Sequence, residues 1–162
     1  MIRIGHGYDV HRFKEGRVCV LCGVTVPCAF GPDGHSDADV ALHALMDAML
    51  GSLAMGDIGK LFPDTDPTYK RVSSLRLLEV VWNRIQRAGW NLVNADITII
   101  AQRPKLAPYI DAMRHSVERA LGVSEGSISV KATTEEGLGF TGDLSGIAAH
   151  AVVLLESAAQ ES

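Results

Sequence analysis

Apolar residues recur with helical spacing in three parts of the chain. The first part follows Ser36-Asp-Ala-Asp39, which has the spacing of a capping box, and runs to about Met55. The second ends at Gly89 and the third at Gly122, because glycine commonly terminates helices. Three amphipathic helices are therefore predicted. Their apolar positions are Val40, Ala44, Met49 and Leu53; Leu75, Leu78, Trp82 and Ile85; and Ile110, Met113, Val117 and Leu121.

Residues typical of strands occupy the stretches around these helices. The chain opens with a strand through Ile4, residues 17–28 are predicted to form a hairpin, and a strand rich in Val, Ile and Thr spans 92–101. Two last strands, 127–134 and 147–155, flank a glycine-rich loop. Residues 56–70 are predicted as a functional loop, because they combine two prolines, two glycines and three aspartates. The predicted class is α/β (α+β), with a single mixed sheet layered with three main helices.

Length and composition fit one domain that covers residues 1–162. The chain is 47% hydrophobic and 21% charged, which is an ordinary globular balance, and it contains no repeat or linker. A domain of this size buries roughly two-thirds of its unfolded surface, so it needs no metal or disulfide merely to fold. A metal site in this chain would therefore serve function.

The charge pattern and the first residues of the sequence indicate which partners and which cellular compartment to expect. The net charge is −4 and the basic residues are scattered, so nucleic acid is not expected as a partner. The first residues lack the pattern of a secretory signal. The longest uncharged apolar stretch, 147–155, is far shorter than the roughly 20 residues of a membrane span. We expect a cytoplasmic protein with no membrane partner.

Three cysteines, Cys19, Cys22 and Cys28, lie in one early segment. The odd number argues against a disulfide framework. Cys19 and Cys22 form a C-x-x-C, but a strand at this position would put the two thiols on opposite faces, and no second C-x-x-C completes a zinc ribbon. We interpret them as small apolar strand residues.

Two short motifs offer metal ligands. Asp9-Val-His11 places a carboxylate and an imidazole on the same side of an extended chain. His43 lies inside the first predicted helix, with Asp39 and Asp47 one turn away on the same face, and a metal-bound imidazole often donates its other N–H to a carboxylate. Two histidines and one aspartate would leave the fourth position of a zinc site open, as in catalytic sites. A hydrated turn and a hydrated acidic helix face are the alternative interpretation.

Other segments suit phosphate or cation binding. His35 and Ser36 stand at the start of the first predicted helix, where free N–H groups favour an anion, although a simple helix cap is the alternative. Asp64-Thr-Asp66 resembles acidic pairs that hold a divalent cation, or else caps a turn. Lys131-Ala-Thr-Thr-Glu-Glu136 leads into glycines that let backbone approach a phosphate. Walker, dinucleotide-binding and G-x-S-x-G motifs are absent, so acyl transfer is excluded.

Five blocks of sequence, in order, carry a family resemblance. They are Gly5-His-Gly-Tyr-Asp-Val-His11, His35-Ser-Asp-Ala-Asp-Val-Ala-Leu-His43, Gly56-Asp-Ile-Gly-Lys-Leu-Phe-Pro-Asp-Thr-Asp-Pro67, Ile100-Ala-Gln-Arg-Pro-Lys105, and Lys131-Ala-Thr-Thr134 followed by Glu136 and Gly139-Phe-Thr-Gly142. Together they make the chain resemble the 2-C-methyl-D-erythritol 2,4-cyclodiphosphate synthases of the non-mevalonate isoprenoid pathway. The resemblance runs nearly from end to end.

The resemblance implies a reaction and an assembly. The family substrate is 4-diphosphocytidyl-2-C-methyl-D-erythritol 2-phosphate, whose 2-phosphate attacks the β-phosphorus, releases CMP and closes a cyclic diphosphate. The family forms homotrimers whose sheets face the trimer axis and whose active sites lie between neighbouring subunits. A cytidine diphosphate compound and two further copies of the chain are therefore the expected partners.

The resemblance also implies a role for each matching residue. Zinc would be held by Asp9, His11 and His43, and magnesium or manganese by Glu136. His35 and Thr134 would be the catalytic residues that position the phosphates. The implied substrate contacts are Ser36, then Asp57, Ile58 and Gly59 at the polyol, Phe62, Asp64 and Asp66 over the erythritol, and Ala101, Pro104, Lys105, Leu106, Ala107 and Thr133 of the adjacent subunit around the cytidine.

The chain departs from the family after Phe140. Many members have Arg and, two positions on, Glu, where this chain has Asp143 and Ser145. In the family these positions, with the equivalent of Phe140, border an axial channel that can hold an isoprenoid diphosphate. Aspartate removes the pairing partner of a diphosphate and adds like charge. We expect catalysis to survive and channel binding to be weak or absent.

Three other functions are considered. A zinc-dependent phosphoesterase would hydrolyse a nucleoside diphosphate compound and yield a linear product. A trimeric binding protein for prenyl diphosphates would keep the fold without turnover, but the Asp9, His11 and His43 set and the residues at 143 and 145 disfavour it. An assembly partner of neighbouring pathway enzymes would leave no signal in these residues.

Overall fold

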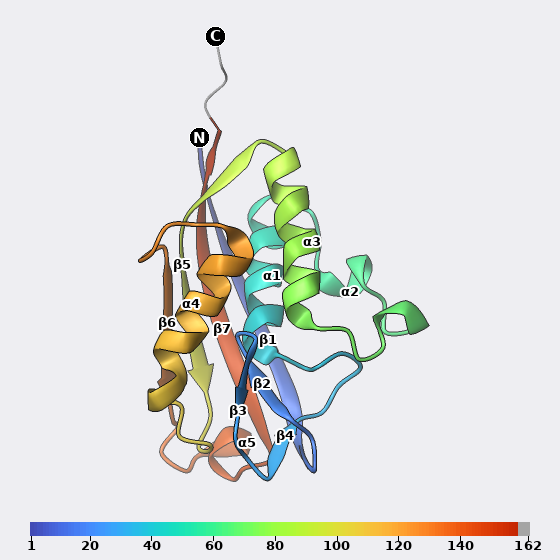
Figure 1. The fold of residues 1–162 in the computed structure, drawn as a ribbon, viewed down its shortest axis with the longest axis vertical. Helices are drawn as coiled ribbons and strands as arrows, with labels where there is room; N and C mark the ends of the chain where they lie inside the picture. Colours follow the sequence, from blue (N-terminus) through green and yellow to red (C-terminus); the bar gives the residue numbers. More distant parts are fainter. Residues whose placement is uncertain (159–162) are drawn as a thin grey trace.

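The computed structural model describes residues 1–158, which form a five-stranded mixed sheet and a layer of helices (Figure 1). The strand order is β4-β1-β7-β5-β6, and only the β5–β6 pair is parallel among the pairs of this sheet. The predicted domain's last four residues, 159–162, lie outside the described residues. The strands are β1 (Ile2–Glu15), β4 (Phe30–Pro32), β5 (Trp90–Ile100), β6 (Ile128–Thr133) and β7 (Gly146–Ser157).

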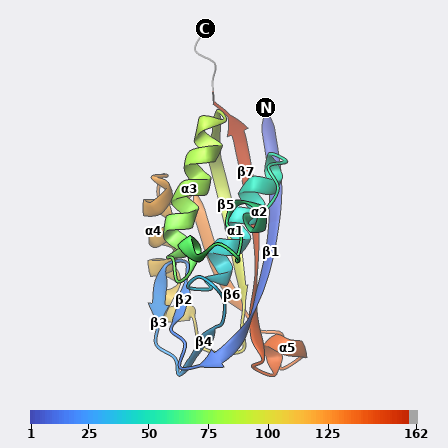
Figure 2. The ribbon, with the colours of Figure 1, turned by 90° about the vertical axis from the view of Figure 1, so that its right-hand side faces the viewer.

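Three long helices cover one face of the sheet, as Figure 2 shows. They are α1 (Val40–Ser52), α3 (Ser74–Arg87) and α4 (Ile110–Leu121). Four shorter turns of helix connect them or end the loops: α2 (Ile58–Leu61), η1 (Pro67–Tyr69), η2 (Ala107–Tyr109) and α5 (Gly139–Gly142). The predicted mixed-sheet α+β class with three main helices is confirmed. None of the helices in the described residues is long and apolar enough to cross a membrane.

Several element boundaries differ from those predicted. The strand predicted through Ile4 continues to Glu15, because it pairs with β7 over eleven residues up to Arg12 and then with β4. The first helix begins at Val40, and its N-cap is Asp39 rather than Ser36. The segment 56–70, predicted as irregular, contains the short helices α2 and η1, whose N-caps are Asp57 and Asp66.

The predicted hairpin at 17–28 forms a two-stranded ribbon outside the main sheet. Its strands are β2 (Cys19–Leu21) and β3 (Val24–Val26). Cys22 lies in the turn with a φ of 49° rather than on the strand, so the prediction that it opposes Cys19 across a strand was wrong. All three cysteines are free thiols, and burial raises the pKa of Cys19 to about 12. Such a thiol is an unreactive core residue.

Helix α1 is buried on almost every side, with eleven of its 13 residues buried. It packs on β1 at two glycines, where backbone approaches backbone. A Cβ atom at Gly5 or Gly7 would overlap the carbonyl oxygens of Ala48 and Ala44. Only glycine permits this distance between strand and helix, and the distance sets where the next residues of β1 meet the helix.

The opposite face of the sheet carries exposed apolar side chains. Residues of β1 alternate between the two faces, so the residues between the glycines and site residues point away from α1. Among the described residues, Figure 2 shows only the short α5 on this side, near one end of the sheet. The exposed fractions are 71% for Ile4, 45% for Tyr8, 44% for Val10 and 40% for Val152. The paired imidazoles of His6 and His150 lie among them. A group of exposed apolar side chains on one sheet face is typical of a surface that another chain covers.

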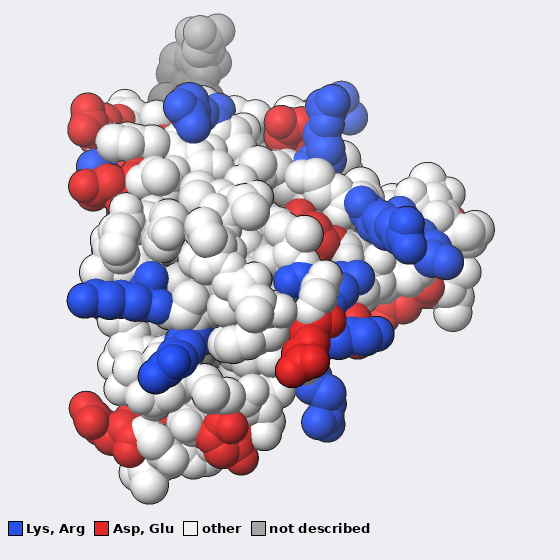
Figure 3. Space-filling view, turned by 60° about the horizontal axis from the view of Figure 1, so that its bottom comes forward, with Lys and Arg blue, Asp and Glu red and all other residues white. Residues whose placement is uncertain are grey.

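Charges are mixed on the face drawn in Figure 3. Lysine and arginine side chains are interspersed there with aspartate and glutamate around a broad area without charge. The ion pairs of the chain include Arg76 with Glu79 and Arg114 with Glu118. A surface with alternating signs creates no extended field of one sign.

Replacing Gly7 tests the contact between β1 and α1. Gly7→Ala is expected to lower the free energy of unfolding by about 3 kcal/mol, because the methyl group forces the strand and helix apart. Gly51→Ala, in the same helix, meets nothing within 4 Å and is expected to raise it by about 0.5–1 kcal/mol. Urea unfolding at one protein concentration measures both. Equal effects of the two substitutions would contradict the packing described here.

Candidate active site

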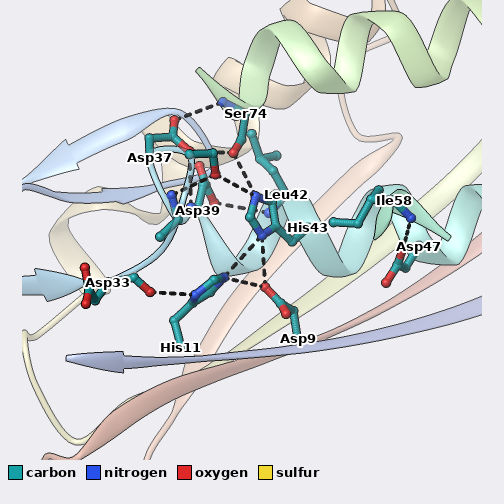
Figure 4. Close-up of polar contacts among 12 residues, drawn as sticks. Asp9, His11, Asp33, Asp37, Asp39, Leu42, His43, Asp47, Ile58 and Ser74 are labelled. Carbon is teal, nitrogen blue, oxygen red and sulfur yellow. Dashed lines mark hydrogen bonds and ion pairs between the residues drawn. The ribbon is translucent and has the colours of Figure 1, made fainter. Parts of the chain in front are cut away.

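Strand β1 and helix α1 bring three candidate metal ligands together (Figure 4). Asp9 and His11 follow Gly5 and Gly7 at intervals of two, so all four residues face the helix. His43 lies on the first turns of α1, just beyond the point where Gly7 contacts Ala44. The glycines thus place the strand close enough for Asp9 and His11 to reach His43.

The ligand atoms of these residues form a tight triangle. His11 Nε2 lies 2.9 Å from Asp9 Oδ2, and His43 Nδ1 lies 3.1 Å from the same oxygen. The two imidazole nitrogens are 3.2 Å apart. One carboxylate oxygen and two imidazole nitrogens within 4.8 Å of one another match the ligand set of a zinc ion with a position left open.

The site attracts positive charge. Burial alone would raise the pKa of Asp9, but hydrogen bonds and charge from His11 and His43 outweigh it and lower the pKa to about 2. Burial alone would lower the pKa of His11, but the contact with Asp9 outweighs it and raises the pKa above its ordinary value. A partly buried carboxylate beside two imidazoles is therefore stabilised by a proton or a cation held between the three groups.

Neither Asp39 nor Asp47 bonds the imidazole of His43, which corrects the prediction from helical spacing. Asp39 caps α1 and accepts hydrogen bonds from the backbone N–H groups of Leu42, Cys22 and Gly23. These contacts connect the β2–β3 turn to the helix. Burial raises the pKa of Asp39 to about 6 even though the three hydrogen bonds act to lower it.

Asp47 also forms its hydrogen bond with a group other than His43. Its carboxylate accepts from the N–H of Ile58 at 2.8 Å, and burial raises its pKa. The contact holds the start of α2 against α1. The Nε2 atom of His43 instead contacts two hydroxyls, those of Ser74 at 3.0 Å and Ser36 at 3.3 Å.

A cavity of about 380 Å³ opens beside the three ligands. It is bounded by the loop before α1, by α2 and η1, and by α3. Of the predicted site residues, the structure brings into its wall Asp9, His11, His35, Ser36, His43, Ile58, Gly59, Phe62 and Asp64. Phe62 and Tyr69 pack edge to face with ring centres 5.2 Å apart, which closes one side with apolar surface.

Two predicted contacts from the same loop lie at the edge of this cavity. Asp57 accepts from the N–H of Lys60 at 2.9 Å as the cap of α2, and Asp66 accepts from the N–H of Thr68 at 2.9 Å as the cap of η1. Neither side chain lines the cavity. The backbone carbonyl of Asp66 does accept from His35 Nε2 at 3.3 Å, which fixes that imidazole.

A second cavity, of about 760 Å³, lies at the ends of β5 and β6. All six residues predicted around the cytidine line it, together with Thr134. They are Ala101, Pro104, Lys105, Leu106, Ala107 and Thr133. Among the described residues, none lines both cavities. A single chain therefore presents the predicted substrate contacts in two separate halves.

Glu136 and Phe140 line neither cavity. Glu136 is exposed, with a φ of 54°, and its N–H donates to Thr134 Oγ1 at 3.2 Å. Phe140 lies on α5 and is 42% exposed on the side of the sheet that the long helices leave uncovered. Within one chain Glu136 contacts Thr134 at the rim of the second cavity, and Phe140 lines neither cavity.

Sequence reasoning missed several residues that shape the site. Asp33 accepts a hydrogen bond from His11 Nδ1 through its backbone carbonyl at 2.9 Å. Ser74 contacts His43 from α3, and Tyr69 and Leu77 line the first cavity. A serine at a helix start and a carbonyl group carry no distinctive sequence signal, because their roles depend on how distant elements meet.

The fold and the site together define a class: an α+β protein with an Asp-His-His group of metal-ligand type beside a cavity. Comparison with known proteins is more specific, because the sequence pattern of the YgbB family matches residues 2–156. The chain belongs to the YgbB family.

Several known proteins similar to this chain are named 2-C-methyl-D-erythritol 2,4-cyclodiphosphate synthase. The 2-C-methyl-D-erythritol 2,4-cyclodiphosphate synthase of Trichlorobacter lovleyi is 62% identical over 95% of this chain and 98% of its own length. The bifunctional IspDF of Campylobacter jejuni superposes with a TM-score of 0.94 at 42% identity, over 97% of this chain, which spans only 42% of that protein. A 2C-methyl-D-erythritol-2,4-cyclodiphosphate synthase bound to CDP superposes with a TM-score of 0.87 at 40% identity, over 95% of this chain and 100% of its own.

Removing the carboxylate of Asp39 tests how the helix that carries His43 is fixed. Asp39→Ala is expected to lower the free energy of unfolding by about 3 kcal/mol or more, because it leaves three backbone N–H groups without an acceptor. Asp57→Ala removes a cap from the exposed helix α2 and is expected to cost about 1 kcal/mol or less. Denaturant unfolding compares the two variants, and a smaller loss for Asp39→Ala than for Asp57→Ala would refute the assignment.

Proposed function

We propose that the chain cyclises 4-diphosphocytidyl-2-C-methyl-D-erythritol 2-phosphate to 2-C-methyl-D-erythritol 2,4-cyclodiphosphate and releases CMP. The observation that carries this proposal is the Asp9, His11 and His43 triangle beside a cavity, in a chain 62% identical to a synthase of that name. The enzyme is a phosphorus–oxygen lyase, because the phosphate that attacks belongs to the substrate itself and water takes no part.

The reaction needs charge neutralisation more than acid–base catalysis. A phosphate monoester has its second pKa at about 6, so at neutral pH it is already an ionised nucleophile, and the departing CMP is a weak base. The obstacle is the repulsion between two anionic phosphates. Holding the 2-phosphate in line with the diphosphate also removes an entropic cost of several kcal/mol when the geometry is tight, on the order of the effects measured for intramolecular reactions.

Residues of this chain are suited to hold the cations that this chemistry requires. Asp9, His11 and His43 would hold zinc, since two imidazoles and a carboxylate are typical zinc ligands. Glu136 would help hold magnesium or manganese, which oxygen ligands prefer. When bound, the two cations supply positive charge to the phosphate oxygens in the transition state.

Other side chains position the substrate. His35, held by the Asp66 carbonyl, and Thr134, at the end of β6, are the proposed catalytic residues that contact the phosphates. Phe62 and Tyr69 exclude water from the first cavity, which favours cyclisation over hydrolysis. The remaining contacts follow the predicted grouping: Ser36, Asp57, Ile58, Gly59, Asp64 and Asp66 in the first half, and Ala101, Pro104, Lys105, Leu106, Ala107 and Thr133 in the second.

The active unit is proposed to be a homotrimer of single-domain subunits. The two cavities share no lining residue among the described residues, and in the proposed trimer a neighbouring copy would supply the cytidine half to the metal half. The exposed apolar side chains of β1 and β7 offer the surface that such copies would cover, with the sheets facing the axis. One continuous apolar core and the family match over residues 2–156 support a single domain.

Replacing His43 tests the reaction and its metal together. His43→Ala is expected to abolish zinc binding and CMP release while the trimer stays intact, because one of three ligands is lost and the sheet surface is untouched. His115→Ala, on the exposed side of α4, is the matched control and is expected to behave like the wild type. Zinc content, CMP release and sedimentation measure the three properties.

The product distinguishes cyclisation from hydrolysis. In water labelled with oxygen-18, the proposed reaction gives unlabelled CMP and a cyclic diphosphate identified by phosphorus NMR. A linear bisphosphate with one labelled oxygen would instead establish the phosphoesterase alternative. Unchanged turnover of His43→Ala would contradict the site assignment.

Asp143 and Ser145 are proposed to weaken binding of prenyl diphosphates on the uncovered side of the sheet. The carboxylate of Asp143 is exposed and accepts from the N–H of Ser145 at 2.8 Å. Hydrogen bonds from the Ser145 side chain and backbone hold the pKa of Asp143 below its usual range, so it is ionised at neutral pH. An ionised carboxylate repels a diphosphate where a family arginine would pair with it.

Calorimetry tests this departure from the family. Titration of the wild type with geranyl diphosphate is expected to give no saturable heat. The double variant Asp143→Arg with Ser145→Glu restores the family residues and is expected to gain a saturable binding isotherm. Tight binding by the wild type would refute the proposal.

A further inference from the structure

The buried nitrogen of His43 contacts a hydroxyl that sequence reasoning missed. Ser74 begins α3 and is fully buried, and its Oγ lies 3.0 Å from His43 Nε2 (Figure 4). The other nitrogen, Nδ1, faces Asp9 Oδ2 at 3.1 Å. The hydrogen bond at Nε2 therefore decides which nitrogen of this imidazole is free to bind a cation.

The direction of the Ser74 hydroxyl proton is fixed by the second partner of this hydroxyl, Asp37. Its hydroxyl donates to Asp37 Oδ1, and its backbone N–H donates to Asp37 Oδ2 at 3.0 Å. The N–H of Asp39 also donates to Asp37 Oδ1, at 3.2 Å. An ionised carboxylate can only accept hydrogen bonds, so the single proton of the Ser74 hydroxyl points to Asp37. Ser74 Oγ then has only lone pairs left for His43, and His43 Nε2 must carry the hydrogen.

In the neutral imidazole, this assignment leaves the lone pair on His43 Nδ1, directed at the centre of the ligand triangle. His11 reaches the same state by a different contact. Its Nδ1 lies 2.9 Å from the carbonyl oxygen of Asp33, which can only accept, so Nδ1 carries a hydrogen, and in the neutral imidazole the lone pair is on Nε2, the nitrogen that faces Asp9. Both imidazoles thus present an acceptor to the same point, as ligands of a cation must.

Ser36 cannot replace Ser74 in this role. Its hydroxyl lies farther from His43 Nε2, at 3.3 Å, and accepts from the N–H of Ala38 at 3.1 Å. Among the described residues, no carboxylate bonds the Ser36 hydroxyl, so nothing fixes the direction of its proton. Of the two hydroxyls at His43 Nε2, only that of Ser74 has its proton directed by a carboxylate, that of Asp37.

We propose that Asp37 and Ser74 are positioning residues that fix the tautomer of His43, through the chain from the Asp37 carboxylate to the Ser74 hydroxyl to the His43 Nε2–H. The inference rests on the proposed metal centre. The other tautomer would turn an N–H toward the cation and lose one of three ligands. Neither Asp37 nor Ser74 touches the substrate cavity, so both act only through His43.

Zinc affinity is the first test. Ser74→Ala is expected to weaken zinc binding by about 10–100-fold, the range found when an outer partner of a ligating histidine is removed. Ser73→Ala is the matched control, because Ser73 precedes it in the chain and makes no capping hydrogen bond. Competition with a chromophoric chelator measures both constants, and thermal unfolding of the metal-free proteins confirms that both variants are folded.

The coupling between the two residues is the second test. Asp37→Ala is expected to weaken zinc binding in the same direction, and the double variant with Ser74→Ala is expected to be no weaker than the weaker single variant. If the two losses of zinc binding free energy simply add, the residues act independently, and the proposed hydrogen-bond chain from Asp37 through Ser74 to His43 is wrong.

The tautomer itself gives a readout that requires neither metal nor turnover. In the metal-free wild type, nitrogen-15 NMR of the imidazoles is expected to show hydrogen on Nε2 of His43, and Ser74→Ala is expected to show a mixture of tautomers. Zinc affinity within twofold of the wild type and an unchanged tautomer in Ser74→Ala would overturn the inference. A wild type with the expected tautomer that takes up no zinc would contradict the proposed metal centre and leave the proton chain supported.

Discussion

The close packing of β1 on α1 is the contact on which the site depends. Gly5 and Gly7 let the strand backbone meet the helix backbone, and residues at the same interval of two then reach the first turns of the helix. Asp9 and His11 are therefore placed opposite His43 by the same alternation that buries the glycines. Because α1 is buried on almost every side, and Asp39 caps it while bonding the β2–β3 turn, the helix has little freedom to slide along the strand. The ligand positions are a consequence of backbone packing, which makes them rigid before any ion arrives.

The electrostatics of this site match the task of the proposed reaction. A partly buried carboxylate whose pKa is lowered to about 2 by two neighbouring imidazoles is a place where positive charge is stabilised. Joining two phosphates of one substrate requires positive charge and alignment, and it requires little proton transfer. The two cavities share no lining residue among the described residues, and the proposed trimer would bring the metal half of one chain to the cytidine half of its neighbour. The exposed apolar face of the sheet supplies a surface for that assembly.

Sequence patterns predicted the parts of this structure that depend on local chemistry. Helical spacing located α1, α3 and α4, and the alternation of extended chain put Asp9 and His11 on one side. The same reasoning misassigned Asp39 and Asp47, because helical spacing shows which residues share a face and does not show what else competes for a carboxylate. The carboxylate of Asp39 accepts hydrogen bonds from three backbone N–H groups, and that of Asp47 accepts one from the N–H of Ile58 at the start of α2. The partner of His43 is Ser74, which comes from a helix thirty-one residues away and has no local signal. The length of β1 was also missed, because pairing with β7 depends on residues at the far end of the chain.

The central claim is that Asp9, His11 and His43 jointly bind a zinc ion through atoms that the fold has already oriented. Diffraction at the zinc absorption edge, on crystals grown with zinc and without chelator, tests this most directly. The account predicts one strong anomalous peak within bonding distance of the Asp9 carboxylate, His11 Nε2 and His43 Nδ1, with a further position open toward the cavity. A triangle that is splayed apart and holds no peak, or a zinc ion bound through His43 Nε2, would contradict it.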